Sequence, residues 1–402
     1  MYVCRRILKH AQLGAVLLCA VFALPPVAAQ TTPTAGQAIP GLEAFDDAML
    51  ALLTKNNYPG ATLAVAYKGK LVLDKAYGFA KKGLANDTPM VAGQRMRLAS
   101  LSKWITAAAA LKAAEQGKLD LDKPIVQLLG FSENPADYAD ARVTAITLRQ
   151  LLQNHAGWMI DRNNDPMFER SPPCPNSAAR WLSAQKLQTD PGQLYSYSNL
   201  NFCLAQLAIE KASGQKYTDF VLAQIAAPAG IKSWEFATLR GKADEPEYTA
   251  NSTDRISAYL NLDFESLGGA GAWTSSAADY LRFMVAQRWQ MNGSPMPLLS
   301  AASIAQLSAR PAAAASATAA VYYGLGVNAR PVANGGVNVF HSGSLPGTSS
   351  YAVSYANGWS LVAIFNGRVA SDIRDASVAE TGRRLSDAIS KSGQPAGEIR
   401  PF

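Results

Sequence analysis

Apolar residues change their spacing twice near the start of the chain. Between residues 41 and 56 they recur every three to four positions, which predicts an amphipathic helix. Residues 62–67 and 71–77 then form two short apolar runs on either side of Lys68-Gly69-Lys70, which predicts a hairpin. The chain therefore begins with a helix followed by antiparallel strands.

The same pattern predicts strands near the other end of the chain and helices between the two sets. Residues 118–255 have mostly helical spacing, including an amphipathic helix over 199–212 that stops at Gly214. The Asn357-Gly358 pair predicts a tight hairpin turn, and a last helix is expected over 371–390. The strands expected in this part of the chain cover residues 323–328, 337–341, 349–355 and 359–365.

Strands at both ends of a chain with helices between them indicate one sheet built from both ends. We therefore predict an α+β protein with an antiparallel sheet flanked by helices and a helical insertion domain. The predicted α/β domain is discontinuous, covering 41–117 and 256–395, and the mainly helical domain covers 118–255. Residues 30–40 are polar and are expected to form a disordered lead-in.

The first 29 residues have the pattern of a secretory signal peptide. Basic residues precede an apolar run over 13–24, and Val27-Ala28-Ala29 supplies small residues for cleavage before Gln30. The apolar run is too short to cross a bilayer as a helix. We therefore expect a periplasmic or secreted protein whose mature chain has no transmembrane anchor.

Charge and cysteine content narrow the class of protein further. The formal net charge is +7, but three basic residues lie in the leader and the others are scattered, so nucleic-acid binding is not indicated. Two of the four cysteines, Cys174 and Cys203, follow the leader. In an oxidising compartment they form either a disulfide, which we expect, or two free thiols.

A serine three residues before a lysine occurs three times, at Ser100, Ser183 and Ser213. Residues three apart share a helix face, so the hydroxyl and the amine can meet, and a desolvated amine can activate a serine. The Ser213 pair straddles the helix stop at Gly214, and the Ser183 pair lies in a polar helix. Only Ser100 opens an apolar, alanine-rich helix, expected over 100–116. Ser100 and Lys103 are therefore the predicted nucleophile and its partner.

Two later segments carry residues suited to the same chemistry. Tyr197 and Asn199 lie just before a predicted helix, where a phenol can transfer protons and an amide can orient a substrate. His341, Gly343 and Ser344 end a predicted strand, and the glycine permits a close approach of substrate to the strand edge. The backbone N–H groups of Ser344 and Ser100 are candidate oxyanion donors.

These three segments, in this order, resemble those of the serine β-lactamase and penicillin-binding protein superfamily, most closely its class C β-lactamase, D-alanyl-D-alanine carboxypeptidase and esterase branch. The resemblance extends over residues 42–390. It implies a β-lactamase/transpeptidase-like fold, no cofactor, and an acyl-enzyme on Ser100. Lys103 and Tyr197 would then move protons, either of them as the general base, and Asn199 would orient the substrate.

The predicted function is therefore an exported serine hydrolase that cleaves an ester or amide of a small or peptide-like molecule. A D,D-carboxypeptidase and a class C-like β-lactamase are the alternatives, and a non-catalytic penicillin-recognition or scaffold protein is the alternative from another class. Many β-lactamases have a lysine where this chain has His341. A histidine is mostly neutral above about pH 6.5, which weakens the expectation of β-lactamase activity.

Other chemistries find little support in the sequence. Only His155 and His341 follow the leader and no His-Glu-x-x-His occurs, so no metal site is expected, and His155 is expected to be structural. No Gly-x-Ser-x-Gly segment is present, which disfavours an α/β-hydrolase. Trp158 and Trp273 are candidate walls of an acyl pocket, as are Phe168 and Tyr195.

Overall fold

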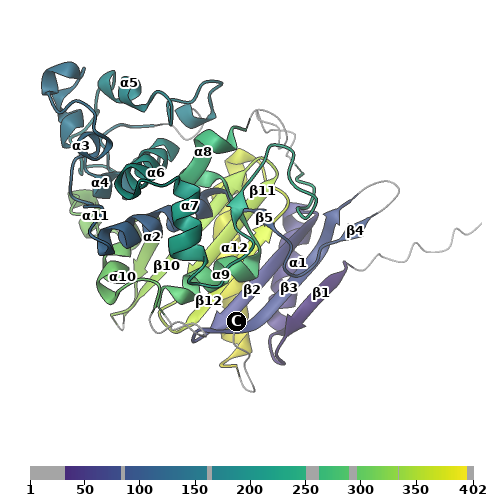
Figure 1. Cartoon of the computed structure of the whole chain (residues 1–402). Helices are drawn as coiled ribbons and strands as arrows, with labels where there is room; N and C mark the ends of the chain where they lie inside the picture. The colour runs from purple at the N-terminus through teal and green to yellow at the C-terminus, as the bar shows by residue number, and fades with distance from the viewer. Residues whose placement is uncertain are drawn as a thin grey trace, which may run out of the picture. The chain divides into compact units, whose positions relative to one another are not determined.

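An antiparallel sheet made from both ends of the chain forms the centre of the computed structural model (Figure 1). The structure describes residues 32–82, 87–160, 165–249, 262–288, 297–333 and 335–395, so the predicted signal peptide lies outside the described residues. Within these residues the main sheet has nine strands. Eight follow the order β1-β3-β2-β12-β11-β10-β9-β8, and β4 pairs with β3. The strands are β1 Thr34–Ala38, β2 Gly60–Tyr67, β3 Lys70–Lys81, β4 Thr88–Pro89, β8 Tyr322–Tyr323, β9 Asn328–Pro331, β10 Val337–Leu345, β11 Thr348–Ser354 and β12 Trp359–Phe365.

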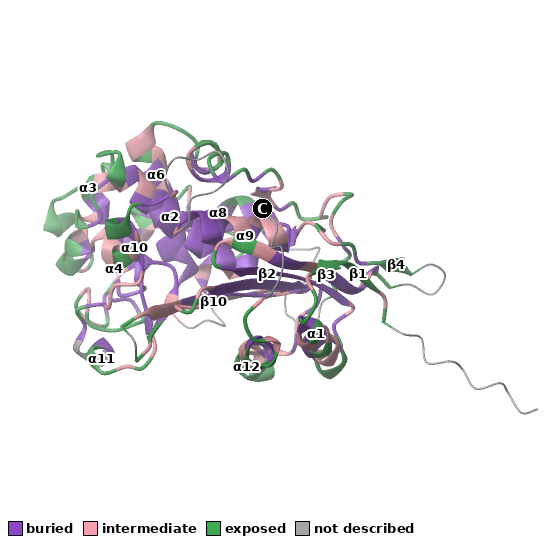
Figure 2. Cartoon of the chain, turned by 90° about the horizontal axis from the view of Figure 1, so that it is seen from below, coloured by how far each residue is buried: buried purple, intermediate pink, exposed green. Residues whose placement is uncertain are grey.

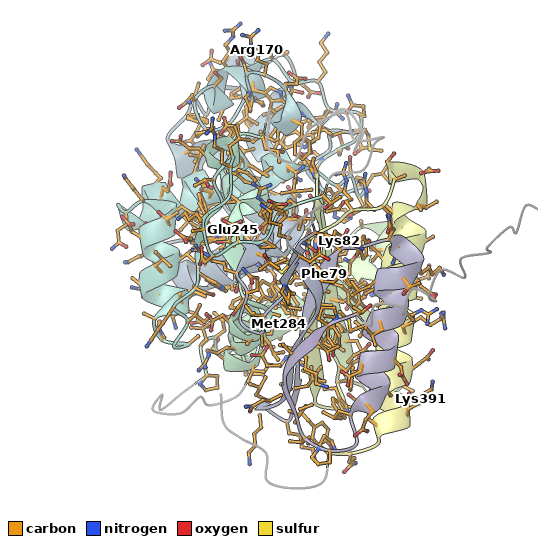
Figure 3. The ribbon with its side chains drawn as sticks, turned by 90° about the vertical axis from the view of Figure 1, so that its right-hand side faces the viewer. Phe79, Lys82, Arg170, Glu245, Met284 and Lys391 are labelled. Atoms are coloured by element: carbon orange, nitrogen blue, oxygen red, sulfur yellow. A yellow bond between two sulfur atoms is a disulfide. The ribbon has the colours of Figure 1, made fainter. Side chains whose placement is uncertain are left out.

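The pairing of β2 with β12 joins the two ends of the chain. Every residue of both strands is buried, as expected of strands covered on both faces. On one face lie α1 (Glu43–Asn56) and α12 (Arg374–Ser392), which run side by side (Figures 2 and 3). The helices on the other face include α2 (Ser102–Glu115), α6 (Asn199–Ser213), α8 (Phe264–Gly271) and α9 (Ala277–Ala286).

Shorter elements complete the part of the chain that the structure describes. A small sheet has the order β5-β7-β6, and the 3₁₀ turn η1 leads directly into α2. These elements are β5 Met96–Arg97, β6 Glu235–Phe236, β7 Trp273–Ser275, η1 Ala99–Leu101, η4 Pro166–Phe168, α3 Ile125–Leu129, α4 Leu148–Leu152, α5 Ala178–Ser183, α7 Tyr217–Val221, α10 Ala301–Leu307 and α11 Ala314–Ala317.

Most of the predicted elements are present close to their expected ends. The hairpin β2–β3, the strand over 359–365, the helix that stops at Gly214 and the last helix are confirmed. From residue 32 onward the chain forms one compact unit. Its division into a discontinuous α/β domain and a helical domain stays a prediction.

Two predictions about local backbone structure are wrong. The lead-in over 30–40 is not disordered throughout, because Thr34–Ala38 forms β1 and pairs with β3 in register from Thr34↔Tyr77 to Ala38↔Leu73. A free edge of β3 supplies backbone hydrogen bonds that a polar composition does not reveal. The strand expected over 323–328 is instead the end of β8, a turn and the start of β9. Gly326 lies in the turn at φ 67°, where a Cβ would come within 2.5 Å of the Lys103 carbonyl oxygen.

Candidate active site

Ser100 lies in the η1 turn, between the small sheet and the first residue of α2. The residue before it, Ala99, has a left-handed φ of 51°, which is uncommon for a residue other than glycine. Hydrogen bonds on both sides hold this turn: Leu98 N–H donates to the Trp273 carbonyl at 2.9 Å, and the Leu101 carbonyl accepts from the Tyr280 hydroxyl at 2.8 Å. The surrounding structure thus maintains a strained backbone next to Ser100.

Lys103 is fully buried beneath Ser100 and is surrounded by acceptors. Its Nζ lies 3.2 Å from Ser100 Oγ, 2.6 Å from Asn199 Oδ1 and 2.6 Å from the carbonyl oxygen of Ala270. Two of these partners, the Asn199 and Ala270 oxygens, can only accept, so two N–H groups of Nζ point to them and the remaining position of the nitrogen faces the Ser100 hydroxyl. The Nζ also lies 4.8 Å from the centre of the Tyr197 ring, a cation–π contact. Lys103 is therefore held at hydrogen-bonding distance from the predicted nucleophile.

A kink in α8 aims the Ala270 carbonyl at Lys103. Gly268 has non-helical backbone angles (φ 40°, ψ −128°), and a Cβ there would lie 2.1 Å from Gln206 Oε1. The same Gln206 oxygen accepts from Gly269 N–H at 2.8 Å, and the Gly269 carbonyl accepts from Thr106 at 2.7 Å. The glycine run is therefore explained by the close packing of α8 against α2 and α6.

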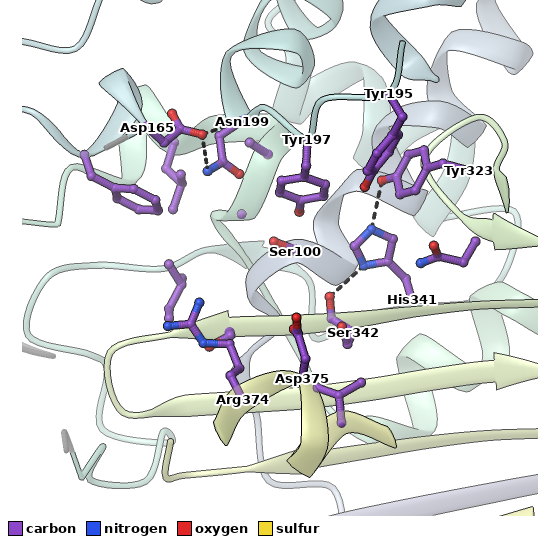
Figure 4. A pocket seen from close by; sticks show the side chains of 18 residues that line it. Ser100, Asp165, Tyr195, Tyr197, Asn199, Tyr323, His341, Ser342, Arg374 and Asp375 are labelled. Carbon is purple, nitrogen blue, oxygen red and sulfur yellow. Dashed lines mark hydrogen bonds between the residues drawn. The ribbon is translucent and has the colours of Figure 1, made fainter. Parts of the chain in front are cut away.

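Tyr197 and Asn199 reach the same place from the start of α6. Figure 4 shows the Tyr197 hydroxyl pointing toward Ser100. The Tyr197 ring packs beside the rings of Tyr323 and His341, with centres 6.2 Å and 6.3 Å away. Asn199 Oδ1 is the acceptor for Lys103, and Asn199 Nδ2 donates to Asp165 at 2.9 Å. The Ser100–Lys103 motif and the Tyr197–Asn199 motif, 94 or more residues apart in sequence, therefore meet at Lys103.

His341 is buried on β10 with both ring nitrogens engaged. Its Nδ1 lies 2.6 Å from the Ser342 carbonyl oxygen, and its Nε2 lies 2.8 Å from the Tyr323 hydroxyl (Figure 4). A carbonyl only accepts, so Nδ1 carries a proton, and a neutral imidazole then accepts from Tyr323 through Nε2. Both contacts are thus satisfied by a neutral ring.

Gly343, two residues further along β10, packs against the Ser100 turn. A Cβ on this glycine would lie 2.4 Å from the Leu98 carbonyl oxygen and 3.0 Å from Ala99 Cβ. The opposite residue of β11, Ser350, donates from its hydroxyl to the same Leu98 carbonyl at 2.8 Å. Gly343 is therefore explained by the approach of η1 to the sheet.

A pocket of about 150 Å³ opens over Ser100 (Figure 4). Ser344 lines it, as do two residues from the start of α12, Arg374 and Asp375, which the sequence patterns did not single out. The remaining lining residues are Asp165, Phe168, Tyr195, Tyr197, Asn199, Leu267, Ala270, Gly271, Tyr323, Asn328, His341, Ser342, Leu345 and Val378.

Trp158 and Trp273 do not line this pocket, and their assignment as pocket walls is wrong. Both are buried in the core, where their indole N–H groups donate to Asn201 Oδ1 at 3.0 Å and to the Tyr217 hydroxyl at 3.0 Å. A tryptophan whose N–H finds an internal partner can be buried completely. Phe168 and Tyr195, by contrast, do line the pocket.

Sequence reasoning also missed side chains that belong to the site. Tyr323 precedes a glycine-containing turn, but its contact with His341 requires the fold. Asp165 lies in an irregular stretch with no periodicity, so no sequence signal distinguishes it from its polar neighbours.

The other chemistry-bearing residues are structural. Cys174 and Cys203 form a disulfide that joins the segment before α5 to α6. His155 is buried with Nδ1 2.7 Å from the Gln153 carbonyl, and burial lowers the pKa of this imidazole. Among the described residues, no group of three or more His, Cys, Asp or Glu is placed to hold a metal ion. No helix in the described part of the chain combines the length and hydropathy of a membrane span.

This fold, with a serine and a lysine at the start of a buried helix facing a sheet edge, is that of the serine β-lactamase and transpeptidase superfamily. The family model described as Beta-lactamase matches residues 45–381, and the chain belongs to that family. Members of the superfamily are serine hydrolases.

Solved structures show the same fold. The D-amino acid amidase from Ochrobactrum anthropi SV3, complexed with D-phenylalanine, superposes with a TM-score of 0.69 at 21% identity, covering 87% of this chain and 99% of that one. The D-alanine carboxypeptidase AmpC from Burkholderia cenocepacia superposes with a TM-score of 0.66 at 17% identity, covering 85% and 98%.

A curated relative matches over a shorter range. The putative fimbrial assembly protein FimD, serogroup D, from Dichelobacter nodosus is 34% identical over 211 residues, which is 51% of this chain and 51% of that protein. The chain thus spans about half the length of this curated relative.

Proposed function

We propose that this protein is a serine hydrolase that cleaves an ester or amide through an acyl-enzyme on Ser100. The observation that carries the proposal is the position of Lys103 Nζ, buried and 3.2 Å from Ser100 Oγ, below a pocket. A serine hydroxyl is a weak nucleophile until a neighbouring group accepts its proton. Here both Lys103 and Tyr197 lie next to the hydroxyl.

The chemistry proceeds in two halves. Ser100 Oγ attacks the acyl carbon while its proton passes to the Lys103–Tyr197 pair, and the same proton is then delivered to the departing alcohol or amine. Water next attacks the acyl-enzyme, loses a proton to the pair and releases the acid, which restores Ser100. The backbone N–H groups of Ser100 and Ser344, both in the pocket lining, are the proposed donors to the oxyanion.

The substrate class is a small or peptide-like ester or amide. Tyr195, Tyr323 and Phe168 supply aromatic walls around Ser100, which suits an acyl group with an apolar part. A neutral imidazole satisfies both contacts of His341. This favours an esterase or amidase over an enzyme that requires a substrate carboxylate. A D,D-carboxypeptidase is the second candidate, supported by the fold shared with the D-alanine carboxypeptidase.

Labelling with a fluorophosphonate probe tests the proposal. Wild type should become covalently labelled and Ser100→Ala should not. Ser183→Ala is the matched control, because Ser183 has the same spacing to a lysine but is half-buried outside the pocket, with its hydroxyl bonded to the Arg180 carbonyl; it should label like wild type. A non-catalytic role would be favoured instead if the wild-type protein is not labelled by the probe and also hydrolyses none of three substrate types: short-chain p-nitrophenyl esters, D-amino acid amides and nitrocefin.

We also propose that the protein works in the periplasm or outside the cell. The basic, apolar and small-residue order of positions 1–29 supports this, and a disulfide is typical of oxidising compartments. N-terminal sequencing of the protein from a periplasmic or culture fraction should begin at Gln30.

A further inference from the structure

Asp165 is a buried carboxylate at the edge of the site, with 3% of its surface exposed. It precedes η4, where its Oδ1 accepts from Met167 N–H at 2.9 Å. Its Oδ2 accepts twice from Asn199: from the backbone N–H at 3.0 Å and from the side-chain Nδ2 at 2.9 Å. Every described contact of this carboxylate is therefore a hydrogen bond that it accepts, as its charge requires.

These bonds decide which way the Asn199 amide faces. An amide has a donor end and an acceptor end, and a carboxylate only accepts. Nδ2 must therefore face Asp165, which leaves Oδ1 facing Lys103 Nζ at 2.6 Å. With the amide reversed, its NH₂ group would face the lysine amine and its oxygen would face the carboxylate, so both bonds would be lost.

The contacts form an unbroken series from Asp165 through Asn199 and Lys103 to Ser100 Oγ, with successive distances of 2.9, 2.6 and 3.2 Å (Figure 4 shows the first). We propose that Asp165 is a positioning residue that acts through Asn199 to hold Lys103 against Ser100. This inference rests on the proposed function, since it assigns a role in activating the proposed nucleophile.

A purely structural role has a different signature. Ser198, at the N-cap of α6, makes no side-chain capping bond, so Asp165 also caps this helix through the Asn199 N–H. Loss of a cap alone lowers stability and leaves the chemistry of the folded enzyme unchanged. Loss of a positioning residue, by contrast, lowers turnover, and this loss of turnover is transmitted through the Asn199 side chain.

A double-mutant cycle separates the two roles. Asp165→Asn keeps the shape of the side chain and removes its charge, so its amide can compete for either end of Asn199. We expect kcat/KM on p-nitrophenyl acetate and the rate of fluorophosphonate labelling to fall roughly 10- to 100-fold, mainly through kcat with little change in KM. In an Asn199→Ala background the same change should lower kcat by less than about threefold, because the group that transmits the effect is gone.

Asp140→Asn is the matched control. Asp140 also accepts from two backbone N–H groups, those of Arg142 and Leu187, but it does not line the pocket. It should lose stability and keep wild-type kcat, with thermal unfolding confirming that all variants are folded at the assay temperature.

Equal losses in both backgrounds, or a folded Asp165→Asn protein with wild-type kcat, overturn the positioning role. An unreactive wild type overturns the proposed function and this inference together. A reactive wild type beside an unaffected Asp165→Asn overturns the inference alone, so the two failures are distinguishable.

Discussion

The His341 ring on β10 lies 6.3 Å from the Tyr197 ring and contacts the Tyr323 hydroxyl and the Ser342 carbonyl. Neither contact requires a charged ring. A lysine at this position would bring a permanent positive charge to the pocket wall. His341 is therefore the residue through which the charge preference of the site is most directly tested.

His341→Lys should improve the use of carboxylate-bearing substrates at pH 8. We expect kcat/KM for an acidic ester, relative to a neutral ester of similar size, to rise roughly tenfold, the value of one added charge-assisted hydrogen bond. Steady-state kinetics on p-nitrophenyl hydrogen succinate and p-nitrophenyl butyrate measure the ratio. Tyr323→Phe removes a contact of His341 without adding charge and should leave the ratio unchanged. An unchanged ratio in His341→Lys would contradict the role assigned to this position.

Asp74 on β3 is a second residue whose ionisation matters, here for stability. Burial, and secondarily the negative charge of Asp279, raise the pKa of Asp74 from 3.8 to about 6. Its Oδ1 is buried without a hydrogen-bond partner in the described structure. The folded state therefore binds the proton of the Asp74 carboxyl more tightly than the unfolded state does. The stability that this protonated form contributes at low pH is lost as the pH rises from about 4 through 6.

Asp74→Asn should therefore raise the free energy of unfolding at pH 7–8, by about 3 kcal/mol, and have little effect below pH 4. Urea unfolding at several pH values measures the difference. Asp47→Asn, on the exposed side of α1, is the control and should show no such pH dependence. A constant difference across the pH range would show that ionisation of Asp74 is not its cause.

At the scale of elements, the position of Ser100 depends on how η1 fits against the sheet. Strand β10 meets η1 at Gly343, and β11 holds the Leu98 carbonyl through Ser350. A side chain at Gly343 would therefore push the turn away from the strand that carries Ser344. The strained Ala99 leaves the turn little freedom to adjust.

Gly343→Ala should lower the fluorophosphonate labelling rate roughly 100-fold, because displacement of the nucleophile by about 1 Å has an effect of that size. Gly382→Ala is the control. Gly382 lies on α12, away from Ser100, and a Cβ there would lie 2.8 Å from the Tyr351 hydroxyl. The substitution should reduce the melting temperature without slowing labelling of the folded protein. Equal labelling of the two variants would remove the steric role of Gly343.

For the whole molecule, the Cys174–Cys203 disulfide ties the irregular segment before α5 to α6, whose first residue is Asn199. The bond spans a sequence separation of 29 residues. A closed loop of this length restricts the unfolded chain and stabilises the folded protein by about 3 kcal/mol.

Replacing both cysteines with serine should lower the free energy of unfolding by about 3 kcal/mol. Wild type should lose a similar amount in dithiothreitol, and the double variant should be insensitive to the reductant. Urea unfolding with and without dithiothreitol measures both. A double variant that dithiothreitol destabilises as much as wild type would contradict the assignment.

The sequence by itself determined the features that depend on neighbouring residues. Apolar spacing located β12 and the helix that stops at Gly214, and the Asn357-Gly358 pair located a hairpin turn, since these follow from local propensity and side-chain period. Ser100 was distinguished from Ser183 and Ser213 because it begins an apolar, alanine-rich helix. Such a composition indicates that the helix is buried.

Only the tertiary structure decided which distant groups meet. Asp165 joins the site because a segment without periodicity folds over the start of α6, and β1 forms because β3 offers an unpaired edge. Trp158 and Trp273 are buried in the core, where internal acceptors satisfy their indole N–H groups. Local patterns report on residues a few positions apart, whereas these contacts join segments tens of residues apart, and packing alone brings those together.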